Sequence, residues 1–120
     1  MPLVRLDILE GQSEAFVANL LDATHRVMVQ VFALSIHDRH QIVCKHSRDH
    51  LVIEDTGLGI ERTGNVVVVS ITSRPSPEHT RLRFYERLCR ELQSSCGISP
   101  SDVVVVITPD WTPGIAGRGF

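Results

Sequence analysis

The stretch NVVVVSITSRPSPEH, residues 65–79, joins an apolar run to a helix start signal. The run at 65–72 is typical of a strand that is buried on both faces. Ser76 is a good helix N-cap, Pro77 suits the first helical position, and Glu78 suits the first turn. The stretch therefore predicts a strand that leads directly into a helix.

The residues after this stretch complete a β-α-β unit. Gly97 ends the predicted helix, and DVVVVI at 102–107 predicts another strand. The predicted apolar stripe of the helix consists of Leu82, Tyr85, Leu88, Cys89 and Leu92, and its solvated face carries Arg81, Arg83, Arg87 and Arg90. A right-handed crossover makes the two strands of such a unit parallel.

The first half of the chain has the same order of features. LVRLDI at 3–8 predicts a half-buried strand, and HQIVCKH at 40–46 predicts a second one. Between them Ser13 is the N-cap of a helix that ends near Leu34. A loop at 47–64 separates the two halves.

The two halves, about 2–46 and 65–108, are therefore a tandem repeat within one domain, 1–120. LSIHD at 34–38 corresponds to ISPSD at 98–102, each between a helix and a strand. We expect an α/β fold of the α+β type, with a four-stranded sheet and both helices on one face.

The valine runs predict a partner. VVVV at 66–69 and at 103–106 is apolar on both faces, whereas two helices cover only one face of a sheet. Another copy of the chain is the expected cover, so the sequence predicts a symmetric homo-oligomer.

Composition excludes several classes of protein. The formal net charge of −2 and the pI of about 6.3 argue against nucleic-acid binding. No apolar run reaches the length of a membrane span, and the N-terminus lacks the pattern of a signal peptide, so a cytoplasmic protein is expected. The spacing of the cysteines and histidines predicts neither a disulfide framework nor a metal site.

Pro2 is the first candidate for chemistry. Removal of Met1 leaves a secondary amine, and the reference pKa of an α-amino group is roughly 8. Burial lowers that pKa and makes a general base, whereas a nearby carboxylate raises it and keeps an ammonium donor. Both alternatives stay open from the sequence.

The chain resembles the tautomerase superfamily, and within it the malonate semialdehyde decarboxylase group. The resemblance rests on the start Met1-Pro2-Leu3, on Leu9-Glu10-Gly11, Asp38-Arg39, EDTGLG at 54–59, Ser73-Arg74-Pro75, CGISP at 96–100 and Asp110-Trp111. It implies a homotrimer of β-α-β repeats that acts on a small carboxylate. No cofactor or metal is expected, and neither nucleic acid nor a membrane is expected as a partner.

The resemblance also implies the site residues. Pro2, Asp38 and Arg74 match catalytic positions, and Arg74 also matches a substrate-binding position. Trp111 is a candidate substrate-binding residue that either forms a wall of an apolar pocket or anchors the C-terminal tail. The group has a second substrate-binding arginine at the position of Ser76. Arg39 or Arg118 is a candidate to supply the missing positive charge. Ser76 itself is interpreted as the cap of the second helix.

Three functions follow as hypotheses. The first is decarboxylation of a small 3-oxo acid similar to malonate semialdehyde, with a protonated Pro2 as the electron sink. The second is a keto–enol tautomerase or a hydratase of 2-oxo or unsaturated acids, with Pro2 as general base. The third is a trimeric binding protein without catalysis.

Overall fold

The computed structural model describes residues 2–109, 114–115 and 117–119. The first β-α-β unit comprises β1 (Leu3–Leu9), α1 (Glu14–Phe32) and β2 (Gln41–His46). The second comprises β3 (Val67–Ser73), α2 (Glu78–Cys96), the short 3₁₀ helix η1 (Pro100–Asp102) and β4 (Val103–Pro109). Two short strands follow, β5 (Gly114–Ile115) and β6 (Arg118–Gly119).

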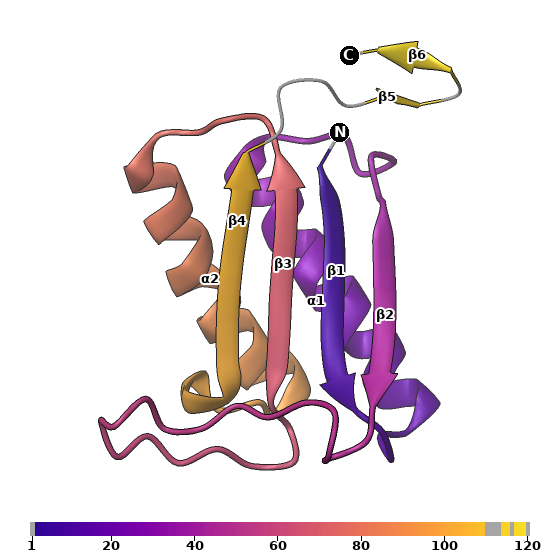
Figure 1. Cartoon of the computed structure of the whole chain (residues 1–120). Coiled ribbons are helices and arrows are strands. Elements are labelled where there is room, and N and C mark those ends of the chain that lie inside the picture. Colours follow the sequence, from indigo (N-terminus) through magenta and orange to yellow (C-terminus); the bar gives the residue numbers. More distant parts are fainter. Residues whose placement is uncertain (1, 110–113, 116, 120) are drawn as a thin grey trace.

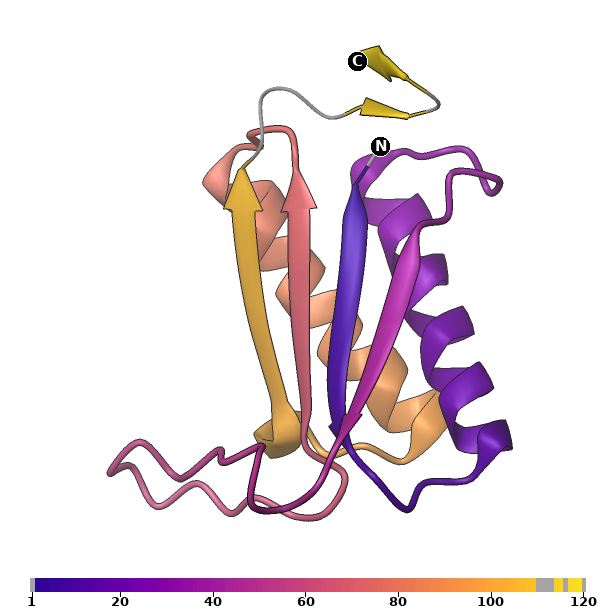
Figure 2. The ribbon, with the colours of Figure 1, turned by 45° about the vertical axis from the view of Figure 1, so that its right-hand side comes forward.

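The four long strands form one mixed sheet in the order β2-β1-β3-β4. β1 and β2 are parallel, β3 and β4 are parallel, and the two units meet through the antiparallel pair β1–β3. Both helices lie against the same face of the sheet (Figures 1 and 2). The predicted tandem repeat and the one-sided helix layer are therefore confirmed.

The two helices begin differently. Ser13 caps α1, because its Oγ accepts a hydrogen bond from the backbone N–H of Phe16 at 3.0 Å. The prediction that Ser76 caps α2 is wrong. The N-cap is Pro77, which offers no side-chain acceptor and whose carbonyl accepts from the N–H of Arg81.

The ends of the helices agree with the sequence pattern. Gly97 ends α2 in the left-handed conformation at φ 68°, where a glycine has no side chain to strain. α1 ends in the same conformation at Ala33, two residues after the buried Val31. Among the described residues, no helix is long and apolar enough to cross a membrane.

The core lies between the helices and the sheet. Leu6 and Val69 from the central strands, Leu20 from α1 and Phe84 from α2 are all inaccessible to solvent. Phe84 stacks at a tilt on Phe32, with 5.4 Å between the ring centroids. These contacts fix how the two halves of the repeat pack together.

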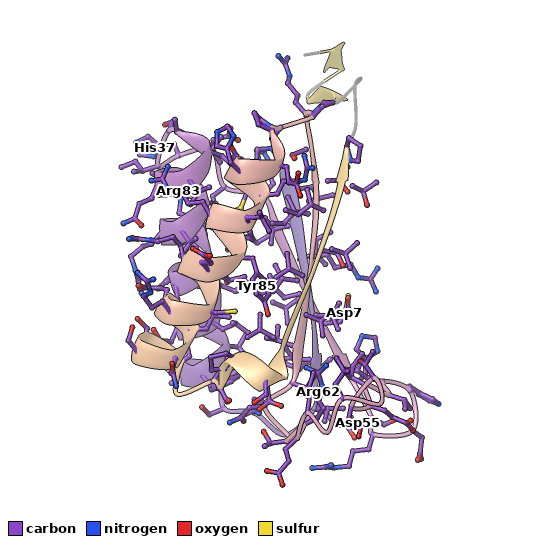
Figure 3. The ribbon with its side chains drawn as sticks, turned by 90° about the vertical axis from the view of Figure 1, so that its left-hand side faces the viewer. Asp7, His37, Asp55, Arg62, Arg83 and Tyr85 are labelled. Carbon is purple, nitrogen blue, oxygen red and sulfur yellow. The ribbon has the colours of Figure 1, made fainter. Side chains whose placement is uncertain are left out.

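The predicted apolar stripe of α2 is partly wrong. Phe84, Leu88 and Leu92 are fully buried, but Leu82 and Tyr85 are exposed by 57% and 42%. These three buried residues follow one another at a spacing of four, so they lie on one side of α2, which faces the sheet. Tyr85 lies on the flank of α2 that faces the sheet edge near β4 (Figure 3).

The other face of the sheet carries no helix. Leu3, Ile42 and Val106 from three different strands are 38%, 46% and 48% exposed there. Asp7 lies among them and accepts hydrogen bonds from Arg5 and from Nε2 of His46 at 2.6 Å. Burial alone would raise the pKa of Asp7, but these hydrogen bonds outweigh it and lower the pKa.

The segment between β2 and β3 crosses the end of the sheet opposite to Pro2 (Figure 1). It is fastened by Asp102, which is 1% exposed. The two carboxylate oxygens of Asp102 accept from the backbone N–H of Thr63 at 2.7 Å and from its hydroxyl at 2.6 Å. Asp102 therefore has a structural role, as its place at a helix-to-strand corner predicts.

We predict that Asp102→Ala destabilises the protein by about 1–3 kcal/mol, because it leaves two donors of Thr63 without acceptors in a half-buried place. The free energy of unfolding in urea measures the effect. Asp49→Ala, on an exposed part of the same segment, is the matched control and should stay within about 0.5 kcal/mol of the parent. Equal effects of the two substitutions would contradict the anchoring role.

Candidate active site

The sheet topology gathers the candidate residues at one end. Leu3 of β1 pairs with Thr72 of β3, so Pro2, just before β1, lies close to Arg74, just after β3. β2 runs parallel to β1, so the turn containing Asp38 and Arg39 reaches the same end. The β5–β6 hairpin lies beyond this end (Figures 1 and 2).

Pro2 and Arg74 line one cavity. Its volume is about 210 Å³, and its walls are Pro2, Phe32, Leu34, Ser73, Arg74, Pro75 and Ser76. Pro2 is buried, whereas Arg74 is exposed. The cavity thus pairs the candidate amine with a guanidinium and has apolar walls from the end of α1, which suits a small organic acid.

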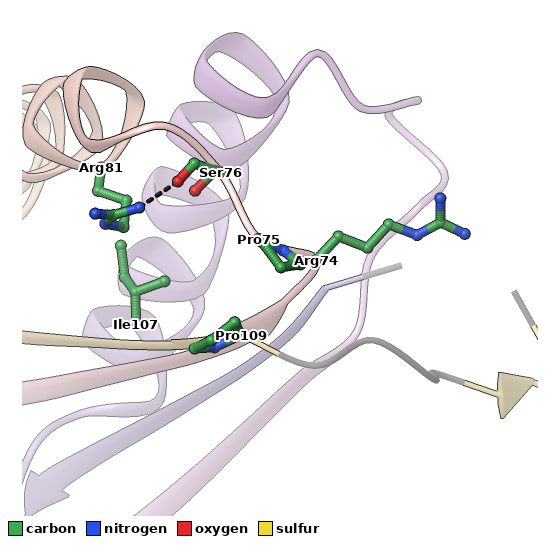
Figure 4. Close-up of a pocket in the computed structure, with 6 residues that line it drawn as sticks. All are labelled: Arg74, Pro75, Ser76, Arg81, Ile107 and Pro109. Carbon is green, nitrogen blue, oxygen red and sulfur yellow. Dashed lines mark hydrogen bonds between the residues drawn. The ribbon is translucent and has the colours of Figure 1, made fainter.

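A second cavity lies on the other side of the segment Arg74–Ser76, between α2 and β4. Its volume is about 320 Å³, and its walls are Arg74, Pro75, Ser76, Arg81, Ile107 and Pro109 (Figure 4). The guanidinium of Arg74 points away from Arg81. Arg74 therefore directs its charge away from this second cavity.

Arg81 was predicted on the solvated face of α2, but it is half-buried in the wall of the second cavity. Its Nη1 donates to the backbone carbonyl of Ser76. The physical reason is geometric, since side chains in the first turn of a helix lean toward the N-terminus and so toward the preceding segment. The sequence carries no separate signal for this position of Arg81, because every side chain of the first turn leans in the same direction.

Ser76 belongs to both cavity walls and caps no helix. Its Oγ is buried and has no hydrogen-bond partner among the described residues. Burial of a hydroxyl without a hydrogen-bond partner costs free energy. Helix capping therefore does not explain the position of Ser76.

Asp38 lies at the same end of the sheet but outside both cavity walls. Its side chain is 26% exposed, and its Oδ1 lies 3.3 Å from Nδ1 of His40, without the alignment of a hydrogen bond. The carbonyl of His40 accepts from the N–H of Val4 at 2.9 Å, which ties this turn to the start of β1. The catalytic role of Asp38 stays a prediction.

Arg39 does not line the cavity of Pro2. Arg39 Nη2 donates to Asp22 at 2.8 Å and its Nε donates to Gln41, so its guanidinium is already bound within the protein. Trp111 and the side chain of Arg118 lie outside the described residues. Among the described residues, no group of three or more His, Cys, Asp or Glu side chains is placed to hold a metal ion.

Comparison with known proteins places this site in a family. The Tautomerase_2 family of tautomerase enzymes matches residues 38–111. YrdN, a probable tautomerase of Bacillus subtilis (strain 168), is 43% identical over 124 residues, which cover 100% of this chain and 96% of the relative.

Solved structures agree. A malonate semialdehyde decarboxylase with decarboxylase and hydratase activities is 39% identical, with a TM-score of 0.88 over 95% of this chain and 92% of that chain. A fused 4-OT, a symmetric trimer, has the same fold at 17% identity, with a TM-score of 0.78 over 97% of this chain and 93% of that chain. With Pro2 and Arg74 in one cavity of this fold, the chain belongs to the tautomerase family of enzymes.

Proposed function

We propose that the protein decarboxylates a small 3-oxo acid similar to malonate semialdehyde, without a cofactor. The observation that carries the proposal is the single cavity lined by both Pro2 and Arg74. The 39% identity to a malonate semialdehyde decarboxylase across nearly the whole chain supports it. Removal of Met1, which frees the amine of Pro2, is part of the proposal.

Decarboxylation needs an acceptor for the electron pair of the bond that breaks. When the bond between C2 and the carboxylate carbon breaks, carbon dioxide leaves and the electron pair moves onto the carbonyl oxygen at C3. A protonated Pro2 donates a hydrogen bond to that oxygen and stabilises the enolate, and C2 then takes a proton from water. Aldehyde and carbon dioxide are the products.

Arg74 holds the carboxylate. A guanidinium binds a carboxylate through two parallel hydrogen bonds, which also sets the direction of the bond that breaks. In this proposal Asp38, on the turn tied to the start of β1, keeps the nearby amine protonated. Trp111 remains a proposed wall of the site.

A second candidate is keto–enol tautomerisation or hydration, and the cavity walls favour it. The described residues that line the cavity include no carboxylate, while Phe32, Leu34 and Arg74 all favour an uncharged amine at Pro2. A neutral Pro2 is a general base, which moves a proton between carbon and oxygen of a 2-oxo acid. The protonation state of Pro2 thus separates the two reactions.

We further propose that the protein is a homotrimer. The exposed apolar residues of the open sheet face, Leu3, Ile42 and Val106, need a cover that the chain itself does not supply. The similar fold of the fused 4-OT forms a symmetric trimer. Three such faces packed around one axis bury this surface in a closed assembly.

Pro2→Ala should reduce the decarboxylation rate about a hundredfold or more, because it replaces the secondary amine on which the electron sink depends. The measurement is proton NMR of malonate semialdehyde with protein whose N-terminus is confirmed by mass spectrometry. No acetaldehyde from the parent protein would refute the decarboxylase. Ketonisation of the enol form of phenylpyruvate by the parent but not by Pro2→Ala would then support the tautomerase, and inactivity on both substrates would favour a binding protein.

Arg74→Gln should raise KM about tenfold or more, because it removes a charge-assisted pair of hydrogen bonds to the carboxylate. Arg48→Gln, at the opposite end of the sheet, removes the same charge and should leave KM unchanged. Arg39→Gln is a third variant, and a matching rise in KM there would show that Arg39 leaves Asp22 to bind substrate. Steady-state kinetics on the three variants decides between these outcomes.

Val106→Glu should dissociate the trimer, because it places three charges in an apolar contact around one axis. Val106 is 48% exposed in the protomer, so the substitution should leave the protomer folded. Ala18→Glu, on the exposed side of α1, is the control. Light scattering should give about three protomer masses for the parent and the control, and one for Val106→Glu. A parent protein of one protomer mass would refute the assembly.

A further inference from the structure

The cavity between α2 and β4 contains a cation without an acidic partner. Arg81 is half-buried in its wall, and no carboxylate of a described residue forms an ion pair with it. Other arginines differ: Arg5, Arg26 and Arg39 lie within 3.1, 2.7 and 2.8 Å of Asp7, Glu91 and Asp22. Among the described residues, these three arginines thus have acidic partners, whereas Arg81 in the cavity wall has none.

The same cavity is lined by a hydroxyl that lacks a partner. Oγ of Ser76 is buried and makes no hydrogen bond with the described residues, although the carbonyl of Ser76 accepts from Arg81. Figure 4 shows the oxygens of Ser76 on the side that faces Arg81.

The rest of the wall is apolar. Pro75, Ile107 and Pro109 close the cavity around Arg81 and Ser76. A guanidinium offers five donors in a planar fork, and only one of the donors of Arg81 is used within the described residues. A ligand that fits needs paired acceptor oxygens and a short hydrocarbon part.

We propose that Arg81 and Ser76 form a binding site for the carboxylate group of a small organic acid. The fork of Arg81 binds the two carboxylate oxygens, the hydroxyl of Ser76 donates a third hydrogen bond, and the apolar wall contacts the carbon chain. This site is separate from the cavity of Pro2 and shares the segment Arg74–Ser76 with it. An acid bound here therefore touches the residues that position Arg74.

The carboxylate has two possible sources. It is either one end of a dicarboxylic acid or the carboxylate of a monocarboxylic acid. Both kinds of acid place a carboxylate on Arg81, so one binding experiment tests the site. Two different acids in that experiment separate the sources. The readout is binding alone and needs no turnover, so it stands even where the proposed decarboxylase fails.

The probes are acetate and malonate, titrated into ¹⁵N-labelled protein at constant ionic strength. The arginine Nε–Hε signals are followed by NMR, and the signal that disappears in Arg81→Gln is that of Arg81. We expect the Arg81 signal to shift and saturate with each acid. Arg81→Gln should weaken binding about tenfold or more, and Ser76→Ala severalfold.

Arg83→Gln is the matched control, because Arg83 is an exposed residue of the same helix outside the cavity and its loss changes the charge equally. It should leave the affinity unchanged. Arg81→Lys keeps the charge without the fork and should bind more weakly than the parent protein, which separates the carboxylate contact from a loss of folding. Amide spectra and melting temperatures check the fold of each variant.

Comparison of the two acids separates the two sources. If malonate saturates the Arg81 signal at a severalfold lower concentration than acetate does, the site prefers a dicarboxylic acid. If the two acids bind equally, the site takes a single carboxylate. A shift of Arg81 that stays linear with concentration, or equal losses in Arg81→Gln and Arg83→Gln, would overturn the proposal.

Discussion

The antiparallel pairing of β1 with β3 determines where chemistry is possible in this molecule. It joins the two halves of the repeat, and its register places Leu3 opposite Thr72 and Leu6 opposite Val69. Leu6 and Val69 are fully buried, so a slip of one residue would turn the apolar side of β1 away from the helices. The core therefore fixes the register, and the register brings Pro2 to the end of the sheet where Arg74 begins the second crossover.

The same sheet leaves one of its faces without a covering layer of helices. Both helices pack on one face, and the core that they form with the sheet uses one side of each strand. The other side still carries valine and isoleucine next to the Arg5–Asp7–His46 group. A face that mixes apolar side chains with a few paired charges is suited to a specific contact, because the charges oppose unmatched orientations while the apolar surface provides the driving force.

The fold was predictable because several local signals agree. The valine runs, Ser13 and Gly97 each mark an element in the sequence, and the order of strand, helix and strand occurs in both halves. The details of α2 were less predictable, because two apolar registers share Leu88, Cys89 and Leu92 and periodicity alone does not choose between them. Packing of Phe84 on Phe32 makes the choice. Arg81 was missed for a related reason, since a charged side chain in the first turn looks the same in sequence whether it faces solvent or a cavity.

Equivalent positions of the two repeat units have different roles. Asp38 and Asp102 occupy the same corner of their units, but the antiparallel arrangement of the units places them at opposite ends of the sheet. Asp102 fastens a crossing segment and is buried, whereas Asp38 lies half-exposed at the end of Pro2. Ser13 and Ser76 differ in the same way, because only Ser13 caps its helix. At the end where Pro2 lies, α2 lacks a side-chain cap, which costs about 1 kcal/mol. Among the described residues, the hydroxyl of Ser76 has no partner, and Arg81 uses one of its donors, on the carbonyl of Ser76. A side chain that does little to stabilise the fold is available to bind a ligand.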